Sequence, residues 1–408
     1  MDNKLLEKLN KVGLKIPHIL LPKSNIDLSK FSCIAADQFT QDLGYWSKVK
    51  EYVGTSPSTY NLIYPEAELE HELTSNKEKF DDVIEEKIKQ INTNMNNYLS
   101  SSVFDDIGES FVYVERQIGN DVRKGLVVAI DLEKYDYNVG AKSLMRATER
   151  TVIERLKVRK RIRRNATIDL PHIMVLINDK NDNLFKTTTD AVNNMLRDGK
   201  DVVDDVTCSC TGELCKHQLY DFNLMFDSGN IKGYKISDPS TIEKIADILI
   251  ELKNAANDNF LYAVGDGNHS LAAAKDIYDE TGKGRYALVE LVNIYDNGLK
   301  FYPIHRLVMG ITEEEFKKET GVDPKSPPPL QDLQIILDEH KYKIDYIHGR
   351  EECETLAKQN GGVAIVYDEF SADTLFDDVI KHGSLCRKSF SMGEAKDKRF
   401  YLEAQRII

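Results

Sequence analysis

One short stretch, AVGDGNHSLAAAK at residues 263–275, constrains the fold of this chain more than any other segment. An apolar run over residues 260–264 enters it like a strand, and small residues leave it in the pattern of a helix. Gly265 and Gly267 stand between the two and allow the backbone to turn sharply. At such a junction the backbone N–H groups and the helix dipole favour an anion. The stretch therefore predicts a strand–turn–helix unit that holds a phosphate.

Other segments continue this alternation of strand and helix. Strand patterns occur at residues 31–36, 110–117, 125–131, 173–178, 286–294, 343–347, 363–367 and 400–408. Helical patterns occur at residues 66–99, 143–156, 187–196, about 270–278 and 330–340. Gly119-Asn120-Asp121 separates two of the strands and predicts a hairpin. The order predicts a mixed α/β (α+β) fold with a mixed sheet.

The proline-rich segment at residues 323–329 is typical of a linker. A chain of 408 residues is long enough for more than one domain. We expect a large domain over residues 1–310 and a smaller C-terminal α+β region over residues 311–408.

Composition excludes several classes of function. The net charge of −13 argues against general nucleic-acid binding, because surfaces that neutralise phosphates are usually basic. No apolar run approaches the roughly 20 residues of a membrane helix, and the N-terminal residues lack the apolar core of a signal peptide. We expect a cytoplasmic protein with reduced cysteines and a small-molecule substrate, without a membrane or nucleic-acid partner. The sequence favours no particular oligomeric state.

Cys208, Cys210, Cys215 and His217 fall within ten positions and suit Zn²⁺ in number. Their spacing differs from the paired Cys-x-x-Cys of common zinc sites. Two interpretations stay open, a metal site and a reduced cysteine-rich loop, and the second is favoured.

Asp266 and His269 bring a carboxylate and an imidazole to the predicted turn. The residues expected to hold the phosphate are Gly265, Gly267, Asn268 and Ser270. Asp266 would repel a phosphate in direct contact, so it makes more sense as a Mg²⁺ ligand or as a base. His269 could donate to a phosphate oxygen. The alternative is a structural turn in which Asp266 caps the helix and His269 bonds to the backbone.

Two basic segments are candidates for the remaining phosphate contacts. Arg146 and Glu149 are neighbours at helical spacing, and Glu149 joins Asp266 and His269 as a candidate catalytic residue. If residues 158–163 form a strand, Arg159 and Arg161 share one face with Arg163. A triphosphate could neutralise that face, but internal Asp and Glu side chains are the favoured explanation.

His305 and Arg306 follow a predicted strand and could flank the same pocket. A surface His–Arg pair is the alternative. Residues 387–394, RKSFSMGE, could close over an anion, although an ordinary turn explains them as well.

Several stretches together resemble the family known as domain of unknown function 1015, and the resemblance spans nearly the whole chain. They are Asp37-Gln38-Phe39, Pro57-Ser58-Thr59, Arg146-Ala147-Thr148-Glu149, Leu170-Pro171-His172-Ile173, Leu219-Tyr220-Asp221-Phe222, Gly265-Asp266-Gly267-Asn268-His269, Pro303-Ile304-His305-Arg306 and Arg387-Lys388-Ser389-Phe390-Ser391-Met392-Gly393. The family name implies no reaction. Where the family has Gly after Arg-Ala-Thr-Glu, this chain has Arg150.

A more distant similarity does imply a reaction. The Asp-Gly-x-His-x-x-Ala-Ala pattern resembles the phosphate-binding segment of the ParB/sulfiredoxin-like superfamily, which includes free-serine kinases. In those kinases the segment is Asp-Gly-His-His-Arg, so its Asp and second His correspond to Asp266 and His269. The first His is Asn268 here and the Arg is Ser270, so Arg306 or the Arg159/Arg161 face would have to replace that Arg.

These resemblances imply a ParB/sulfiredoxin-like core inside a large elaborated domain, with ATP or another nucleoside triphosphate and Mg²⁺ as cofactors. The leading hypothesis is a phosphotransferase that acts on a small hydroxyl metabolite similar to serine. The alternative is a nucleotide-binding regulator without catalysis, which Ser270 slightly favours. Metal-dependent hydrolysis would need more carboxylates near Asp266 than the local sequence contains.

Overall fold

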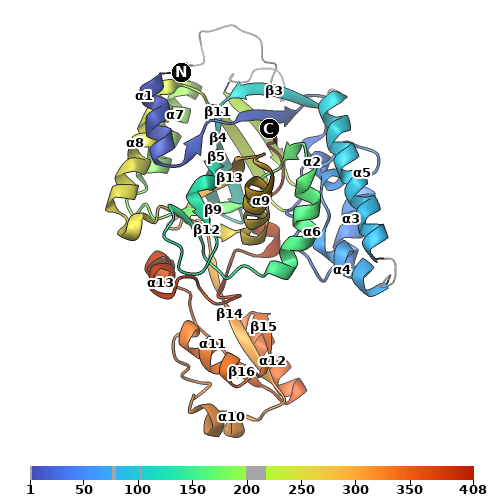
Figure 1. The fold of residues 1–408 in the computed structure, drawn as a ribbon, viewed down its shortest axis with the longest axis vertical. Coiled ribbons are helices and arrows are strands. Elements are labelled where there is room, and N and C mark those ends of the chain that lie inside the picture. The colour runs from blue at the N-terminus through green and yellow to red at the C-terminus, as the bar shows by residue number, and fades with distance from the viewer. Residues whose placement is uncertain (1, 76–79, 102, 199–216) are drawn as a thin grey trace.

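The computed structural model describes residues 2–75, 80–101, 103–198 and 217–408 (Figure 1). The helices are α1 Asn3–Lys11, α2 Leu28–Phe31, α3 Leu43–Val53, α4 Glu66–Ser75, α5 Phe80–Ser100, α6 Ile153–Arg164, α7 Asn183–Asp198, α8 Pro239–Ala255, α9 Asn268–Thr281, α10 Glu313–Thr320, α11 Leu330–Glu339, α12 Arg350–Asn360 and α13 Leu375–His382. In the described residues, no helix is both long and apolar enough to cross a membrane.

The strands complete the mixed α/β fold that the sequence predicts. They are β1 Leu14–Lys15, β2 His18–Pro22, β3 Phe104–Glu109, β4 Phe111–Ile118, β5 Asp121–Asp131, β6 Tyr135–Asp136, β7 Met145–Ala147, β8 Ile168–Asp169, β9 Met174–Ile177, β10 Gln218–Asn223, β11 Asn230–Ile236, β12 Tyr262–Asp266, β13 Tyr286–Asn293, β14 Phe301–Met309, β15 Lys343–His348, β16 Val363–Ile365, β17 Phe390–Met392 and β18 Gln405–Arg406.

Ten strands of the described chain form one central sheet. Nine of them follow the order β10-β11-β4-β5-β13-β9-β12-β7-β6, and β1 pairs with β5 beside this path. The neighbours from β10 to β13 are antiparallel, whereas β13 and β9, β12 and β7, and β7 and β6 are parallel. The sheet is therefore mixed, and β4 and β5 form the hairpin predicted around Gly119.

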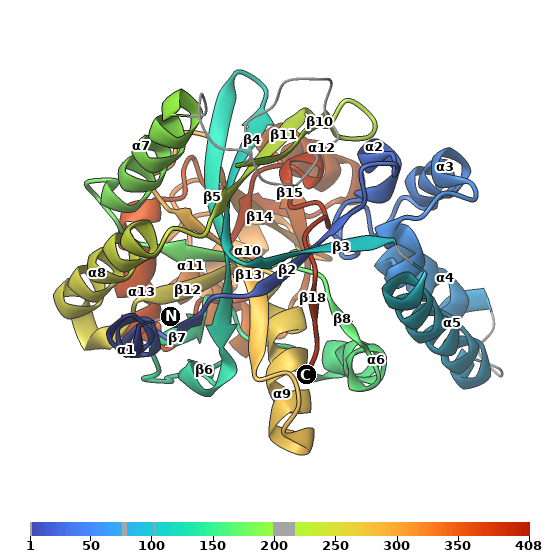
Figure 2. The same cartoon turned by 90° about the horizontal axis from the view of Figure 1, so that it is seen from above.

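Helices cover both faces of this sheet (Figures 1 and 2). On one face, α1, α7 and α8 bury a core that includes Leu9, Val128, Phe185 and Leu249. On the other face, α3 and its neighbours pack Trp46 and Val49 against alternate residues of β4 and β5. Alternation along each strand sends successive side chains to opposite faces, so both cores come from the same strands.

Strand β14 connects the large body to a smaller unit. The first part of β14 pairs with β17 beside the large body, and its second part pairs with β15 and β16. Helices α10, α11 and α12 pack on this small sheet, as Figure 1 shows. From Leu375 the chain returns to the large body, where Phe376 and Phe390 pack with Met174 and Phe260. The expected C-terminal region, residues 311–408, thus contains a returning segment and most of the small unit, but not β14, the strand that pairs with both β15 and β16.

Four predictions of local structure are wrong. Residues 31–36 form only the end of α2 and a single bridge from Ile34 to Phe400. Residues 143–156 contain strand β7 before α6 begins, because this segment pairs with β12. The proline-rich residues 323–329 lie inside the small unit, where Tyr367 O–H donates to Pro328 O, rather than between domains. Within residues 400–408, only β18 is a strand.

Candidate functional site

Strand β12 and helix α9 meet at the glycine turn, as the sequence predicts. Gly267 has φ +81° and directly precedes α9, whose start receives no side-chain cap. A Cβ at Gly265 would lie 2.7 Å from Met392 Sδ and 2.9 Å from Leu176 Cδ1, so glycine fits closely there. The first N–H groups of a helix need partners from outside it, and an anion is one such partner. The turn therefore retains the properties of an anion site.

Asp266, the last residue of β12, is paired with Lys398. Lys398 Nζ lies 3.4 Å from Asp266 Oδ2, and the two side chains are 8% and 17% exposed. Within the described part of the chain, Asp266 Oδ2 is buried and accepts no hydrogen bond. A buried carboxylate oxygen without a donor favours an additional cation or donor group.

His269 bonds to the loop that precedes α6. The N–H of Val152 donates to His269 Nε2 at 3.1 Å. A ring nitrogen that accepts a hydrogen bond carries no proton, so this contact makes Nε2 the unprotonated nitrogen of the His269 ring. Beside it, Asn268 Oδ1 is buried and, among the described residues, has no hydrogen-bond partner. The start of α9 thus contains a buried acceptor that is suited to a donor or a cation, not to a phosphate oxygen.

Glu149 lies in the loop after β7 and holds the returning C-terminal segment. Its two carboxylate oxygens accept the N–H groups of Lys388 and Ser389, each at 3.2 Å. Burial raises the pKa of Glu149, and these two hydrogen bonds offset the effect only in part. Thr148 Oγ1 donates to Val264 O at 2.7 Å, which ties the same loop to β12. Glu149 therefore joins the turn to the C-terminal segment.

Arg146 uses its donors within the protein. It is 3% exposed and donates to Ser143 O and to both the backbone oxygen and the carboxylate of Asp258. Its guanidinium also lies over the Phe260 ring, 4.7 Å from the centroid. This arrangement holds the loop before β12 in place.

Arg306 and His305 lie on β14, in the small unit. The Arg306 side chain is fully buried, and His305 Nδ1 accepts the N–H of Tyr367 at 3.3 Å. Burial lowers the pKa of His305, and the positive charge of Arg350 adds to this effect. The acceptors of the Arg306 guanidinium are Ile304 O, Arg387 O, Lys388 O, Gln334 Oε1 and Cys386 Sγ. The position predicted for a phosphate clamp thus links three chain segments.

The basic run after Glu149 is helix α6, so the condition under which Arg159, Arg161 and Arg163 would share one face, a strand over residues 158–163, is not met. Residues four apart share a face of a helix, whereas alternate residues do not. Arg159 and Arg163 accordingly line one cavity, while Arg161 bonds to Asp81 and Glu85 on α5. Carboxylates neutralise all three arginines, because Arg159 pairs with Glu66 and Arg163 with Asp169.

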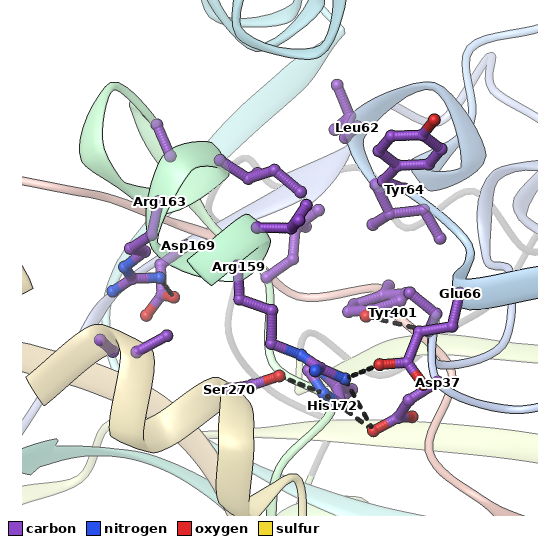
Figure 3. Close-up of a pocket in the computed structure, with 18 of the residues that line it drawn as sticks. Asp37, Leu62, Tyr64, Glu66, Arg159, Arg163, Asp169, His172, Ser270 and Tyr401 are labelled. Carbon is purple, nitrogen blue, oxygen red and sulfur yellow. Dashed lines mark hydrogen bonds and ion pairs between the residues drawn. The ribbon is translucent and has the colours of Figure 1, made fainter. Parts of the chain in front are cut away.

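A cavity of about 340 Å³ lies between α4, α5, α6 and α9 (Figure 3), and we call it the α6–α9 cavity. Asp37, Glu66, Arg159, His172 and Ser270 form its polar end. Arg159 Nη2 and His172 Nε2 each lie 3.9 Å from Asp37 Oδ2, and His172 Nε2 lies 3.0 Å from Ser270 Oγ. Ser270 belongs to the first turn of α9, so the cavity adjoins the glycine turn.

Charged groups at the glycine turn shift the pKa values of groups in the α6–α9 cavity. Burial raises the pKa of Asp37, but His172, Arg159, a hydrogen bond from Gln38 and Lys398 outweigh burial and lower it overall. Burial lowers the pKa of His172, and the negative charges of Asp37 and Asp266 offset this only in part. At neutral pH the site therefore contains ionised Asp37 beside a neutral imidazole.

Comparison with known proteins identifies the family. The sequence profile of a family described as "Protein of unknown function (DUF1015)" matches residues 20–367. The chain belongs to this family. A comparison with curated proteins found no match.

Solved structures show only a distant likeness. A free serine kinase variant in complex with AMP is 12% identical, with a TM-score of 0.36 over 67% of this chain and 90% of that one. Another variant with ADP is 12% identical, with a TM-score of 0.35 over 70% and 93%. A conserved hypothetical protein from Pyrococcus furiosus is 11% identical, with a TM-score of 0.33 over 69% and 94%. Likeness at this level does not establish a function.

Asp37, His172, Glu66 and Lys398 were absent from the candidate residues drawn from the sequence. Asp37 and His172 stand in the family-like stretches Asp37-Gln38-Phe39 and Leu170-Pro171-His172-Ile173, which is the one signal that could have found them. Nothing near Lys398 marks it in the sequence. Cys208, Cys210 and Cys215, three of the four residues considered for Zn²⁺, lie outside the described residues.

We expect His172 to make stability depend on pH. Its lowered pKa means that the unfolded chain takes up a proton below about pH 6.5 while the folded protein resists it. The contribution of neutral His172 to the free energy of unfolding is therefore fully present above pH 6.5. It is lost as the pH falls, by at most about 1.4 kcal/mol per pH unit. In His172→Gln, denaturant midpoints between pH 7.5 and 5.5 should fall less steeply than in wild type. The same change at exposed His71 is the control, and an unaltered slope in His172→Gln would contradict the expectation.

Proposed function

We propose that this protein is a nucleotide- and Mg²⁺-dependent phosphotransferase that acts on a small hydroxyl compound. One observation carries the proposal: the buried Asp266–Lys398 pair lies at the uncapped start of α9, next to a cavity with an ionised carboxylate. A phosphate needs N–H donors and positive charge, a divalent cation needs a carboxylate, and an acceptor hydroxyl needs a hydrogen-bond acceptor.

The terminal phosphates would bind at the start of α9. The N–H groups after Gly267 and the ammonium group of Lys398 supply the donors. Because Lys398 is nearly buried, its charge acts through a medium of lower effective dielectric than water. Arg159 reaches the cavity from α6 and would face the far side of the transferred group.

Asp266 fits a magnesium ion that arrives with the nucleotide. Its Oδ2 accepts no hydrogen bond from the described residues. In that same part of the chain, no three His, Cys, Asp or Glu side chains cluster in a way that could hold a metal. Mg²⁺ commonly binds through one or two carboxylates together with substrate phosphates and water. Bound there, the ion would neutralise phosphate charge.

The acceptor hydroxyl would lie between Asp37 and the start of α9. Its oxygen forms a bond to the γ-phosphorus, the bond from that phosphorus to the bridging oxygen breaks, and the nucleoside diphosphate leaves with the electron pair. The hydroxyl proton passes to the Asp37 carboxylate and then to solvent. Neutral His172 positions Ser270, whose Oγ lies 3.0 Å from the imidazole.

A nucleotide-binding regulator without catalysis is the second candidate. One observation favours it. The carboxylates of Glu66 and Asp37 already neutralise the Arg159 guanidinium, so Arg159 would stabilise the negative charge of a transferring phosphoryl group less. Phosphorus NMR of the protein with nucleotide, Mg²⁺ and a mixture of hydroxyl metabolites separates the two functions, since only the enzyme forms a new phosphate ester.

Nucleotide binding is the first test. ATP, CTP, GTP and ADP are titrated with and without Mg²⁺, by calorimetry and by thermal unfolding. A nucleotide at about 100 times its dissociation constant adds about 2.7 kcal/mol, which raises the midpoint of a cooperative 408-residue protein by about 3 °C.

Lys398→Met should weaken this binding at least about tenfold, because one charge-assisted contact to phosphate is lost. Lys396→Met is the matched control, since Lys396 is 58% exposed and pairs with Glu394. Equal affinity in the two variants, or no binding of any nucleotide to wild type, would overturn the proposal.

A further inference from the structure

The α6–α9 cavity extends well beyond the polar groups that face α9. Its volume of about 340 Å³ falls within the range of small-molecule sites and far exceeds the roughly 10–15 Å³ that one water needs. Figure 3 shows Leu62 and Tyr64 lining the cavity away from Asp37 and His172. Six of the apolar residues on its wall are Leu62, Leu69, Met95, Val158, Ile162 and Ile168. A ligand that fills the cavity needs an apolar body.

The polar end of the cavity has an excess of negative charge. Asp37 and Glu66 contribute two negative charges, Arg159 contributes one positive charge, and burial keeps His172 neutral. The sum is one negative charge, and exposed Glu70 on the lining adds another. An anionic ligand group placed here would be repelled, whereas an ammonium group would be attracted.

Asp37 is the carboxylate best placed for such a group. Its Oδ2 lies 3.9 Å from both Arg159 Nη2 and His172 Nε2, which is ion-pair distance but longer than a hydrogen bond. Gln38 Nε2 donates to the other oxygen, Oδ1, at 3.0 Å. A donor from a ligand could therefore approach Oδ2 without displacing a direct hydrogen bond from Arg159 or His172.

Arg163, the second arginine that lines the cavity, is neutralised by a carboxylate, as Arg159 is. Arg163 bonds to Asp169, whose other oxygen accepts the N–H of Leu288 at 2.8 Å and Nε2 of Gln405 at 3.1 Å. Both arginines on the described lining thus face protein carboxylates, and Arg159 is the one that lies beside Asp37. A ligand carboxylate would have to compete with Glu66 or Asp169 for its counter-ion.

We propose that the α6–α9 cavity binds an aliphatic amino alcohol without a carboxylate. Its ammonium group faces Asp37, its hydroxyl group lies between Asp37 and Ser270 at the start of α9, and its aliphatic body lies on the apolar wall. That this compound is the phosphoryl acceptor rests on the proposed function, whereas its binding does not. The inference replaces a serine-like acceptor by a larger, more apolar one that carries no negative charge.

Leucinol, leucine and 2-aminoethanol are the probes, titrated by calorimetry into the full chain without nucleotide. Leucine carries a carboxylate where leucinol carries its hydroxymethyl group, and 2-aminoethanol lacks the isobutyl group of leucinol. We expect leucinol to bind at least about tenfold more tightly than either, because burial of its isobutyl group is favourable and a carboxylate is repelled. Leucine or 2-aminoethanol binding as tightly as leucinol, or no binding of leucinol, would overturn the proposal.

Two variants locate the binding. Asp37→Asn should weaken leucinol binding about tenfold, and Val158→Phe should abolish it by filling the apolar end. Asp42→Asn is the control for the first, because Asp42 caps α3 at an exposed position and asparagine caps equally well. Unchanged leucinol affinity in both Asp37→Asn and Val158→Phe would contradict the assignment to this cavity.

ATP titrated into the same samples separates the two proposals. Leucinol binding without nucleotide binding would leave the cavity assignment intact and remove the proposed function. Nucleotide binding without leucinol binding would leave the proposed function intact and remove the cavity assignment.

Discussion

Replacement of Asp266 by asparagine should reduce phosphoryl transfer by at least about 100-fold while the protein stays folded. Asparagine keeps the size of the side chain but removes the charge beside the start of α9. The amide cannot hold Mg²⁺ as a carboxylate does, and it no longer neutralises Lys398, whose Nζ lies 3.4 Å from Asp266 Oδ2. Both the rate and the Mg²⁺-dependent part of nucleotide affinity should fall together.

Formation of phosphate ester by phosphorus NMR and nucleotide titrations at several Mg²⁺ concentrations measure these two effects. Asp279→Asn is the matched control, since Asp279 lies on α9, the helix that follows Asp266, is 52% exposed and pairs only with Lys275 among the described residues. Circular dichroism shows whether the variants remain folded. Turnover in Asp266→Asn equal to that of the Asp279 variant would refute the role of Asp266.

Arg399→Met should have the largest effect on stability, at about 3–5 kcal/mol. Arg399 is 2% exposed and bonds to Glu290 and Glu403, both fully buried. Burial raises the pKa of Glu290, but the charges of Arg399 and Arg123 outweigh it and hold that pKa below its usual value. Without Arg399, two buried carboxylates lose their main partner.

The thermal midpoint should fall by about 4–6 °C for a cooperative chain of 408 residues. Calorimetry measures this shift, and Arg406→Met, at an exposed position near the same terminus, should leave the midpoint within about 1 °C. A midpoint for Arg399→Met within 1 °C of wild type would show that the buried network contributes nothing net.

The same network positions the candidate site. Arg399 lies directly between Lys398, which pairs with Asp266, and the segment carrying Tyr401. The Tyr401 ring packs on His172 with 5.2 Å between centroids, and its hydroxyl oxygen accepts the N–H of Ala36 at 3.2 Å. Loosening Arg399 should therefore weaken nucleotide binding as well as stability.

Local signals were sufficient for the glycine turn. Glycine at 265 and 267, an apolar run before them and small residues after them predict strand, turn and helix without reference to the rest of the chain. The hairpin around Gly119 was predictable for the same reason. In both cases the determining interactions lie within about a dozen residues of one another.

The basic segment of α6 shows where such signals fail. Arginines at alternate positions fit a strand with one basic face, and the same residues fit a polar helix. Packing against α5 and α9 selects the helix. In this helix Arg161 faces α5, whereas Arg159 and Arg163 line the α6–α9 cavity. Arg306 is similar, because its acceptors Arg387 O and Lys388 O come from a segment far along the chain.

The sequence by itself determined the mixed α/β class, the family and the turn at Gly265–Ser270, since these depend on short-range patterns and on motifs in order. Only the tertiary structure decided what surrounds the turn. Asp37, His172 and Lys398 come from three distant segments, and tertiary packing places His172 3.9 Å from Asp37 and Lys398 3.4 Å from Asp266. The charge and size of the cavity follow from that packing, because burial and pairing are properties of neighbours in space.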